Sequence, residues 1–105
     1  MFPQGKMGKM LQKAQKAQAK VQEEIAALKL DGTSGGGMVK ATIDGEKHVI
    51  DLVISPEALE EADAAELADL VLAAISDGQR AIDAEVRKKM DSLANMLGLP
   101  PGMGL

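Results

Sequence analysis

A single apolar stripe runs through residues 6–28, and it is the feature that most constrains the fold. The segment KMGKMLQKAQKAQAKVQEEIAAL has no proline and consists mostly of residues that favour helices. Its apolar residues recur with a seven-residue spacing, at Met7, Met10, Ala14, Ala17, Val21 and Leu28. At about 100° per residue these side chains share one helix face, with Leu11 and Ile25 beside them. We therefore predict a long amphipathic helix over 6–28.

Two short runs with alternating apolar residues follow a glycine-rich connector, GTSGGG, at 32–37. The alternating apolar positions are Val39, Ala41 and Ile43 in the first run and Ile50, Leu52 and Ile54 in the second. Between the runs, Asp44-Gly45 is typical of a β-hairpin, because glycine tolerates the positive φ that tight turns require. We expect two strands here and a third, weaker strand over 28–33.

Residues 56–96 have the features of two consecutive helices. Ser55 is a good N-cap, and Pro56 suits the first helical position. A short helix over 56–62 is expected to lead into a long one from Ala64 to about Met96. The apolar positions of the long helix are Leu67, Leu70, Val71, Ala74, Ile82, Val86, Met90, Leu93 and Leu97. The prolines of the tail GLPPGMGL prevent the helix from continuing.

These elements predict an α+β fold with the order α-β-β-β-α. A single domain spans 1–105, with a basic N-terminal helix at 6–28, a sheet and dimer region at 29–55, helices at 56–96 and a flexible tail at 97–105. The chain has one Phe and no Trp or Tyr, and alanine supplies much of its apolar content. Small side chains bury little area each, and such long helices cannot bury their stripes on a small three-stranded antiparallel sheet. A second subunit is therefore expected.

The charges are distributed unevenly, although the formal net charge is −4. Up to Gln22 there is no acidic residue, and five lysines share a seven-residue spacing, at Lys6, Lys9, Lys13, Lys16 and Lys20. They form a stripe of about 21 Å along the predicted helix. Ammonium groups suit the phosphates of DNA, and Gln12 is a candidate for a base contact. The alternative is a solvated face whose lysine stems cover apolar surface.

Toward the end of the last predicted helix lies a second basic group, made up of Arg80, Arg87, Lys88 and Lys89. Basic side chains there also interact favourably with the helix dipole, so this group has an ordinary structural interpretation as well. Seven acidic residues and no basic one occur between Ser55 and Gln79. The absence of Trp and Tyr argues against single-stranded nucleic acid, which is usually bound on aromatic platforms. Duplex DNA is therefore the favoured partner.

The sequence lacks the patterns of an enzyme or a metalloprotein. There is no cysteine, so disulfides, redox pairs and thiolate zinc sites are excluded. The lone histidine, His48, has no neighbouring metal ligand and is interpreted as an ordinary strand residue. No nucleophile elbow, phosphate loop or calcium loop is recognisable. We expect no enzymatic activity, no metal, no cofactor and no small-molecule substrate.

Several motifs together resemble the YbaB/EbfC family of nucleoid-associated proteins. They are the segment Gly35 to Val39, the hairpin Asp44-Gly45, the strand end Ile54-Ser55-Pro56 and the tail Leu99-Pro100-Pro101-Gly102-Met103. The resemblance covers essentially the whole chain. It implies a homodimer likened to tweezers, with a central sheet built from both subunits and with terminal helices that project as arms.

The resemblance also implies a function. Family members bind double-stranded DNA and are thought to influence chromosome organisation and gene expression. The DNA-binding residues that the resemblance implies are Lys6, Lys9, Lys13, Lys16, Lys20, Arg87, Lys88 and Lys89. Gln12 is added to them on the base-contact argument above. The implied dimer contacts are Val39, Ala41, Ile43, Ile50, Leu52 and Ile54. No signal peptide or transmembrane run is recognisable, so the expected location is the cytoplasm, on the nucleoid, without a membrane partner.

An alternative from another class stays open at this point. The helices could pack on a protein partner, with the lysines serving only for solubility, and the chain would then be a structural or interaction module. Binding of duplex DNA near physiological salt distinguishes the two hypotheses, because only the first predicts it.

Overall fold

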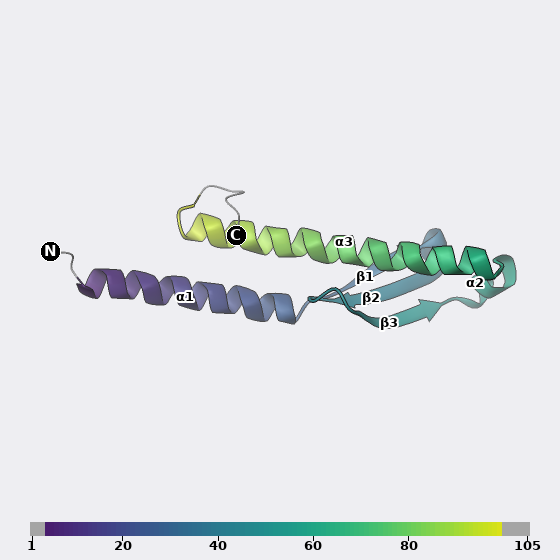
Figure 1. Cartoon of the computed structure of the whole chain (residues 1–105), viewed down its shortest axis with the longest axis horizontal. Coiled ribbons are helices and arrows are strands. Elements are labelled where there is room, and N and C mark those ends of the chain that lie inside the picture. Colours follow the sequence, from purple (N-terminus) through teal and green to yellow (C-terminus); the bar gives the residue numbers. More distant parts are fainter. Residues whose placement is uncertain (1–3, 100–105) are drawn as a thin grey trace.

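The protein is elongated, measuring 73 × 21 × 16 Å, and the computed structural model describes residues 4–99 (Figure 1). The elements in chain order are α1 (Gln4–Ala26), β1 (Lys29–Ser34), a 3₁₀ turn (Gly35–Gly37), β2 (Val39–Asp44), β3 (Val49–Ile54), α2 (Pro56–Glu61) and α3 (Ala64–Met96). The predicted α+β class and the order α-β-β-β-α are confirmed. Residues 100–105 of the predicted tail lie outside the described residues.

The three strands form one antiparallel sheet in the order β1-β2-β3. Helix α3 packs on one face of it, over β1 and β2 (Figure 1). Val39, Ala41 and Ile43 of β2 are fully buried in the core on that face. The opposite face is polar: there the Thr42 hydroxyl donates to the Asp31 carboxylate across the strands, at 2.8 Å. A sheet with one buried and one solvated face is common among antiparallel sheets.

Strand β1 and helix α3 are in backbone contact where they cross. A Cβ atom on Gly32 would lie 2.1 Å from the Ala74 carbonyl oxygen, so only glycine fits there. The sequence predicts a connector over 32–37, but its first three residues extend β1 and only Gly35–Gly37 form the turn. The close approach of α3 explains the difference, because Gly32 serves the packing of the strand and not the turn.

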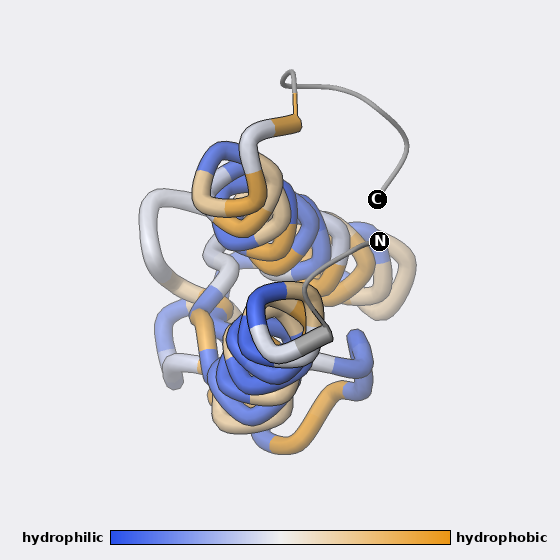
Figure 2. Tube along the Cα trace, turned by 90° about the vertical axis from the view of Figure 1, so that its left-hand side faces the viewer, coloured by the Kyte–Doolittle hydropathy of each residue, from blue (hydrophilic) through white to orange (hydrophobic). Residues whose placement is uncertain are grey.

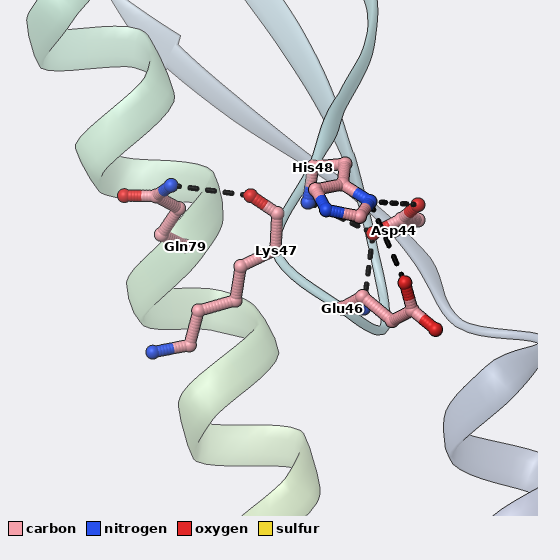
Figure 3. Close-up of polar contacts among 5 residues, drawn as sticks. All are labelled: Asp44, Glu46, Lys47, His48 and Gln79. Atoms are coloured by element: carbon pink, nitrogen blue, oxygen red, sulfur yellow. Dashed lines mark hydrogen bonds and ion pairs between the residues drawn. The ribbon is translucent and has the colours of Figure 1, made fainter.

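The predicted hairpin turn joins β2 to β3 through residues 44–48. Its left-handed residue is Lys47, at φ 71°, and not a glycine. The Asp44 carboxylate holds the turn by accepting hydrogen bonds from the backbone N–H groups of Glu46 and His48, both at 2.9 Å (Figure 3). His48 therefore lies in the turn that precedes β3, and not within the strand as predicted.

Both long helices contact this turn. A Cβ atom on Gly45 would lie 1.9 Å from the Ile25 carbonyl oxygen near the end of α1, which explains the glycine. On the other side, the Gln79 side-chain amide of α3 donates to the Lys47 carbonyl oxygen at 3.2 Å (Figure 3). The Lys47 ammonium lies 2.7 Å from the Asp83 carboxylate. The turn thus joins the sheet to the C-terminal end of α1 and to the middle of α3.

Strand β3 is exposed to solvent along its length. Four large apolar side chains on it remain 39–48% exposed, namely Val49, Ile50, Leu52 and Val53. The register shifts between Thr42 and Ile43, so that Ile43 pairs with Val49 and Ile50 is the extra residue of a bulge. The predicted alternation of Ile50 with Leu52 and Ile54 is therefore interrupted.

The predicted dimer contacts fall into two groups. Val39, Ala41 and Ile43 are fully buried within the single chain, where they pack in the core beneath α3. Ile50 and Leu52 are exposed on β3, and Ile54 is half-buried. Within one chain, this second group retains surface that solvent can reach, and the dimer contacts stay a prediction.

Helix α1 and the second half of α3 lie side by side and antiparallel, and together they project from the sheet as an arm (Figures 1 and 2). The second half of the α1 stripe is half-buried, at Ala14, Ala17, Val21, Ile25 and Leu28. The first half is at least 50% exposed, at Met7, Met10 and Leu11. Within one chain, the predicted apolar stripe is therefore covered only near the sheet.

Candidate nucleic-acid interface

Five exposed lysines form a row along α1, which we call the lysine face: Lys6, Lys9, Lys13, Lys16 and Lys20. Its orientation follows from the packing of α1. The half-buried apolar side of α1 faces α3, and the lysines lie roughly 100° around the helix from that side. Among residues 4–99 no carboxylate forms an ion pair with any of the five ammonium groups. The lysine face is thus an uncompensated row of positive charge about 21 Å long.

The repulsion within the lysine face has a cost. Lys9 and Lys13, like Lys16 and Lys20, are four residues apart and lie next to each other on the helix surface. Each such like-charge pair destabilises a helix by roughly 0.2–0.5 kcal/mol. A polyanion bound along the row would relieve this repulsion, whereas a neutral partner would not.

Lys89, another predicted DNA contact, is less exposed than the lysine face and is ion-paired within the chain. Its ammonium lies 3.2 Å from the Glu24 carboxylate on α1 and 3.9 Å from Glu85 on α3. The side chain is only 20% exposed. Lys89 therefore ties the two helices of the arm together.

The other predicted contact residues are exposed. Arg87 and Lys88 lie on α3, and neither forms an ion pair within the described part of the chain. Lys88 lines a groove between α1 and α3 together with Lys20, so basic groups from both helices border the same cleft. Gln12 lies beside Lys16 in a shallow hollow on α1.

The end of the molecule away from the arm is acidic. We call this region the acidic end; its exposed carboxylates are Glu57, Glu60, Glu61, Asp63, Glu66 and Asp69. Asp63 has a structural role, because it caps α3 by accepting a hydrogen bond from the Glu66 backbone N–H at 2.8 Å. Although the net charge is negative, the positive lysine face and the acidic end lie at opposite ends of the molecule. This separation of charge directs anions toward the arm.

Sequence reasoning missed the residues that hold the outer edge of β1. The Thr33 backbone N–H donates to the Asp77 carboxylate of α3 at 3.0 Å. The Ser34 hydroxyl donates to the Leu70 carbonyl oxygen. These partners lie 44 and 36 residues apart in the chain, so no local pattern marks them.

The turn at 44–48 contains the protein's one described group with a shifted pKa. The hydrogen bond from the His48 backbone N–H, reinforced by that of Glu46, lowers the pKa of the Asp44 carboxyl below its usual 3.8. The His48 ring nitrogen Nδ1 lies 3.5 Å from Asp44 and 3.6 Å from Glu46. The cluster stabilises the turn.

Two classes of site have no counterpart between residues 4 and 99. No three histidine, aspartate or glutamate side chains come together in a way that could hold a metal ion. Nor does any helix in this range combine the length and apolar character needed to cross a membrane.

The fold and the lysine face define a small α+β protein with a basic helical arm, a class suited to binding polyanions. Comparison with known sequences identifies the class more closely. The sequence model of the YbaB/EbfC DNA-binding family matches residues 1–97. The chain belongs to this family.

Similar proteins support the assignment. Nucleoid-associated proteins of Xanthomonas oryzae pv. oryzae and Xanthomonas axonopodis pv. citri are 41% identical to this chain over 104 residues, which covers 96% of this chain and 96% of each relative. Among solved structures, an uncharacterized protein from Helicobacter pylori matches with a TM-score of 0.66 at 28% identity, over 93% of this chain and 100% of that one.

Proposed function

We propose that this protein is a nucleoid-associated protein that binds double-stranded DNA as a homodimer, through the lysine face and the neighbouring Arg87 and Lys88. The observation that carries the proposal is the row of five exposed lysines without acidic partners in the described chain. Family membership and the names of the relatives support DNA as the polyanion. Lysines position phosphates without reading bases, so binding is expected to depend weakly on sequence.

The form of the DNA follows from the shape and chemistry of the arm. The lysine face is a straight, rigid row about 21 Å long, which suits the regular phosphates of a duplex. Single strands are usually held by stacking on aromatic rings, and the chain has no Trp or Tyr. A duplex is therefore the better match.

The homodimer places a second lysine face on the same particle. Strand β3 is the edge suited to pairing, because its apolar side chains are exposed, whereas the edge of β1 already donates a hydrogen bond to Asp77. Pairing β3 with its copy in a two-fold dimer would continue the sheet. The dimer would double the phosphate contacts and steepen the salt dependence of binding. We place this activity in the cytoplasm, on the nucleoid, with effects on chromosome organisation and gene expression.

The test is a duplex titration at several salt concentrations. The variant K9A/K13A/K16A is expected to bind more weakly, and the slope of log K against log salt should flatten by about 0.9 for each phosphate that the variant no longer neutralises. A matched pair of double variants separates position from charge: K13A/K16A removes two charges from the lysine face, and K29A/K40A removes two exposed charges from the sheet.

Only the first variant of this pair is expected to bind DNA less tightly. Equal reductions in both would mean that net charge and not the lysine face governs binding. If wild-type protein failed to bind duplex DNA at low salt and instead co-purified with a protein, the interaction-module hypothesis would replace this one.

A further inference from the structure

A groove separates α1 from α3 along the arm. Its main part has a volume of about 400 Å³ and an apolar floor that includes Ala17, Val21 and Leu93. Met96 also lines a second hollow of about 210 Å³ nearer the tip, beside Met10, so the two hollows adjoin at this side chain. The groove exists because alanines do not fill the space between the two helices.

The rim of this arm groove is positively charged. Four lysines line its two hollows, namely Lys13, Lys20, Lys88 and Lys89, against two glutamates, Glu24 and Glu85. Both glutamates are ion-paired with Lys89. Lys13, Lys20 and Lys88 form no ion pair in the described chain, and the four lysines outnumber the two glutamates around the apolar floor. An occupant that matches this groove is apolar at its centre and acidic at its border.

The acidic end of the same chain has this chemistry. Leu59 on α2 is 61% exposed, and Glu57, Glu60 and Glu61 surround it in the sequence. No basic residue occurs between 55 and 79 to interrupt the acidic surface. A chain cannot place its own α2 in its own groove, because the stretch of α3 between them, from Ala64 to Lys88, is about 36 Å long. The contact has to form between two molecules.

We propose that the arm groove binds the acidic end of a second copy of this protein, with Leu59 on the apolar floor and the neighbouring glutamates against the rim lysines. The two surfaces differ, so the contact is heterologous and links particles end to end, unlike a two-fold pairing of β3. Because exposed charges carry it, added salt weakens it. Lys13 and Lys20 also belong to the lysine face, so this self-association competes with DNA. The proposal itself does not rest on DNA binding.

The test uses full-length protein without DNA, in sedimentation velocity at low and moderate ionic strength. Wild-type protein is expected to form salt-sensitive species larger than the dimer. Variant K20E/K88E reverses the charge of the groove, and variant E60K/E61K reverses the charge of the acidic end. Each should weaken self-association at least about tenfold, because like charges then face each other across the contact. An equimolar mixture of the two variants should restore the larger species, because the acidic groove of one then matches the basic end of the other.

Variant K9E/K16E is the matched control, since it changes the total net charge by the same amount as K20E/K88E but at positions outside the groove. It is expected to associate like the wild type, while L59S should not. The proposal is overturned if the mixture fails to restore association, if K9E/K16E behaves like K20E/K88E, or if wild-type protein forms nothing larger than a dimer at low salt. DNA is absent from each of these measurements, so such a failure leaves the proposed DNA binding standing.

Discussion

Gly78 of α3 lies against Ile43 of β2 so closely that a Cβ atom on the glycine would be 2.4 Å from the isoleucine Cγ1. On the neighbouring strand, Gly32 leaves no room either, with the Gly78 nitrogen 2.1 Å from where its Cβ would lie. The two glycines therefore set the distance between helix and sheet. Since α3 continues from this crossing into the arm, the crossing also sets where the arm begins.

Adding one methyl group at this crossing should destabilise the folded protein. Gly32→Ala is expected to lower the free energy of unfolding by about 3 kcal/mol, because backbone atoms of α3 must move to admit it. Urea unfolding at fixed protein concentration measures the change. Gly8→Ala is the control: nothing lies within 4 Å of its added Cβ, and alanine should stabilise α1 by up to about 1 kcal/mol. Similar midpoints for both variants would contradict the crossing described above.

Lys88 and Lys89 are neighbours in sequence but should behave differently. Lys88→Ala is expected to weaken duplex binding, because its exposed charge borders the same groove as Lys20 of the lysine face. Lys89→Ala removes the ion pair with Glu24, and it should cost about 1 kcal/mol and speed amide hydrogen exchange in α1. Measuring both quantities for both variants separates the roles. The assignment fails if Lys89→Ala weakens DNA binding while leaving exchange in α1 unchanged.

The exposed edge of β3 gives a direct test of the dimer. Val53→Lys places a charge on this strand, and charged residues on an edge oppose strand pairing. We expect the variant to sediment with the mass of a monomer at concentrations where the wild type is dimeric. Leu72→Lys is the matched control, because Leu72 is similarly exposed but lies on α3. A dimer that survives Val53→Lys but not Leu72→Lys would move the interface to the helix.

The turn held by Asp44 should make stability depend on acidity. Its pKa is lower in the folded protein than its ordinary 3.8, so the ionised form favours folding. This contribution is complete at pH well above 3.8 and is lost as the pH falls through the lowered pKa. Asp44→Ala should be less stable than the wild type at neutral pH, and the difference should shrink toward the acid limit. A difference that stays constant down to the lowest pH would exclude the ionised carboxylate as its source.

The helices could be predicted from sequence because their patterns extend over many turns. The alternation in β2 was equally clear, but it shows only that Val39, Ala41 and Ile43 share a face. It does not show whether that face meets a helix of the same chain or a second subunit. The answer depends on Gly32 and Gly78, which bring α3 onto the sheet, and contacts between residues so far apart leave no periodic signal.

The candidate interface was predictable to a similar extent. Five lysines at seven-residue spacing have to share a side of α1, and the structure shows that side exposed. Lys88 and Lys89 could not be told apart, because adjacent residues differ by about 100° around a helix and only the position of α1 decides which one meets Glu24. In the turn, Lys47 and not Gly45 adopts the positive φ. A glycine is needed at position 45 because the Ile25 backbone leaves no room for a side chain there.

The hydrogen bond from the Thr33 backbone N–H to the Asp77 carboxylate occupies a donor on the outer edge of β1. A strand arriving there finds a backbone donor already engaged by the helix above it. If two β3 strands pair as proposed above, the continued sheet has a β1 edge with this engaged donor on each flank. Such an arrangement would oppose open-ended, amyloid-like stacking of a sheet whose last strand exposes valine and isoleucine.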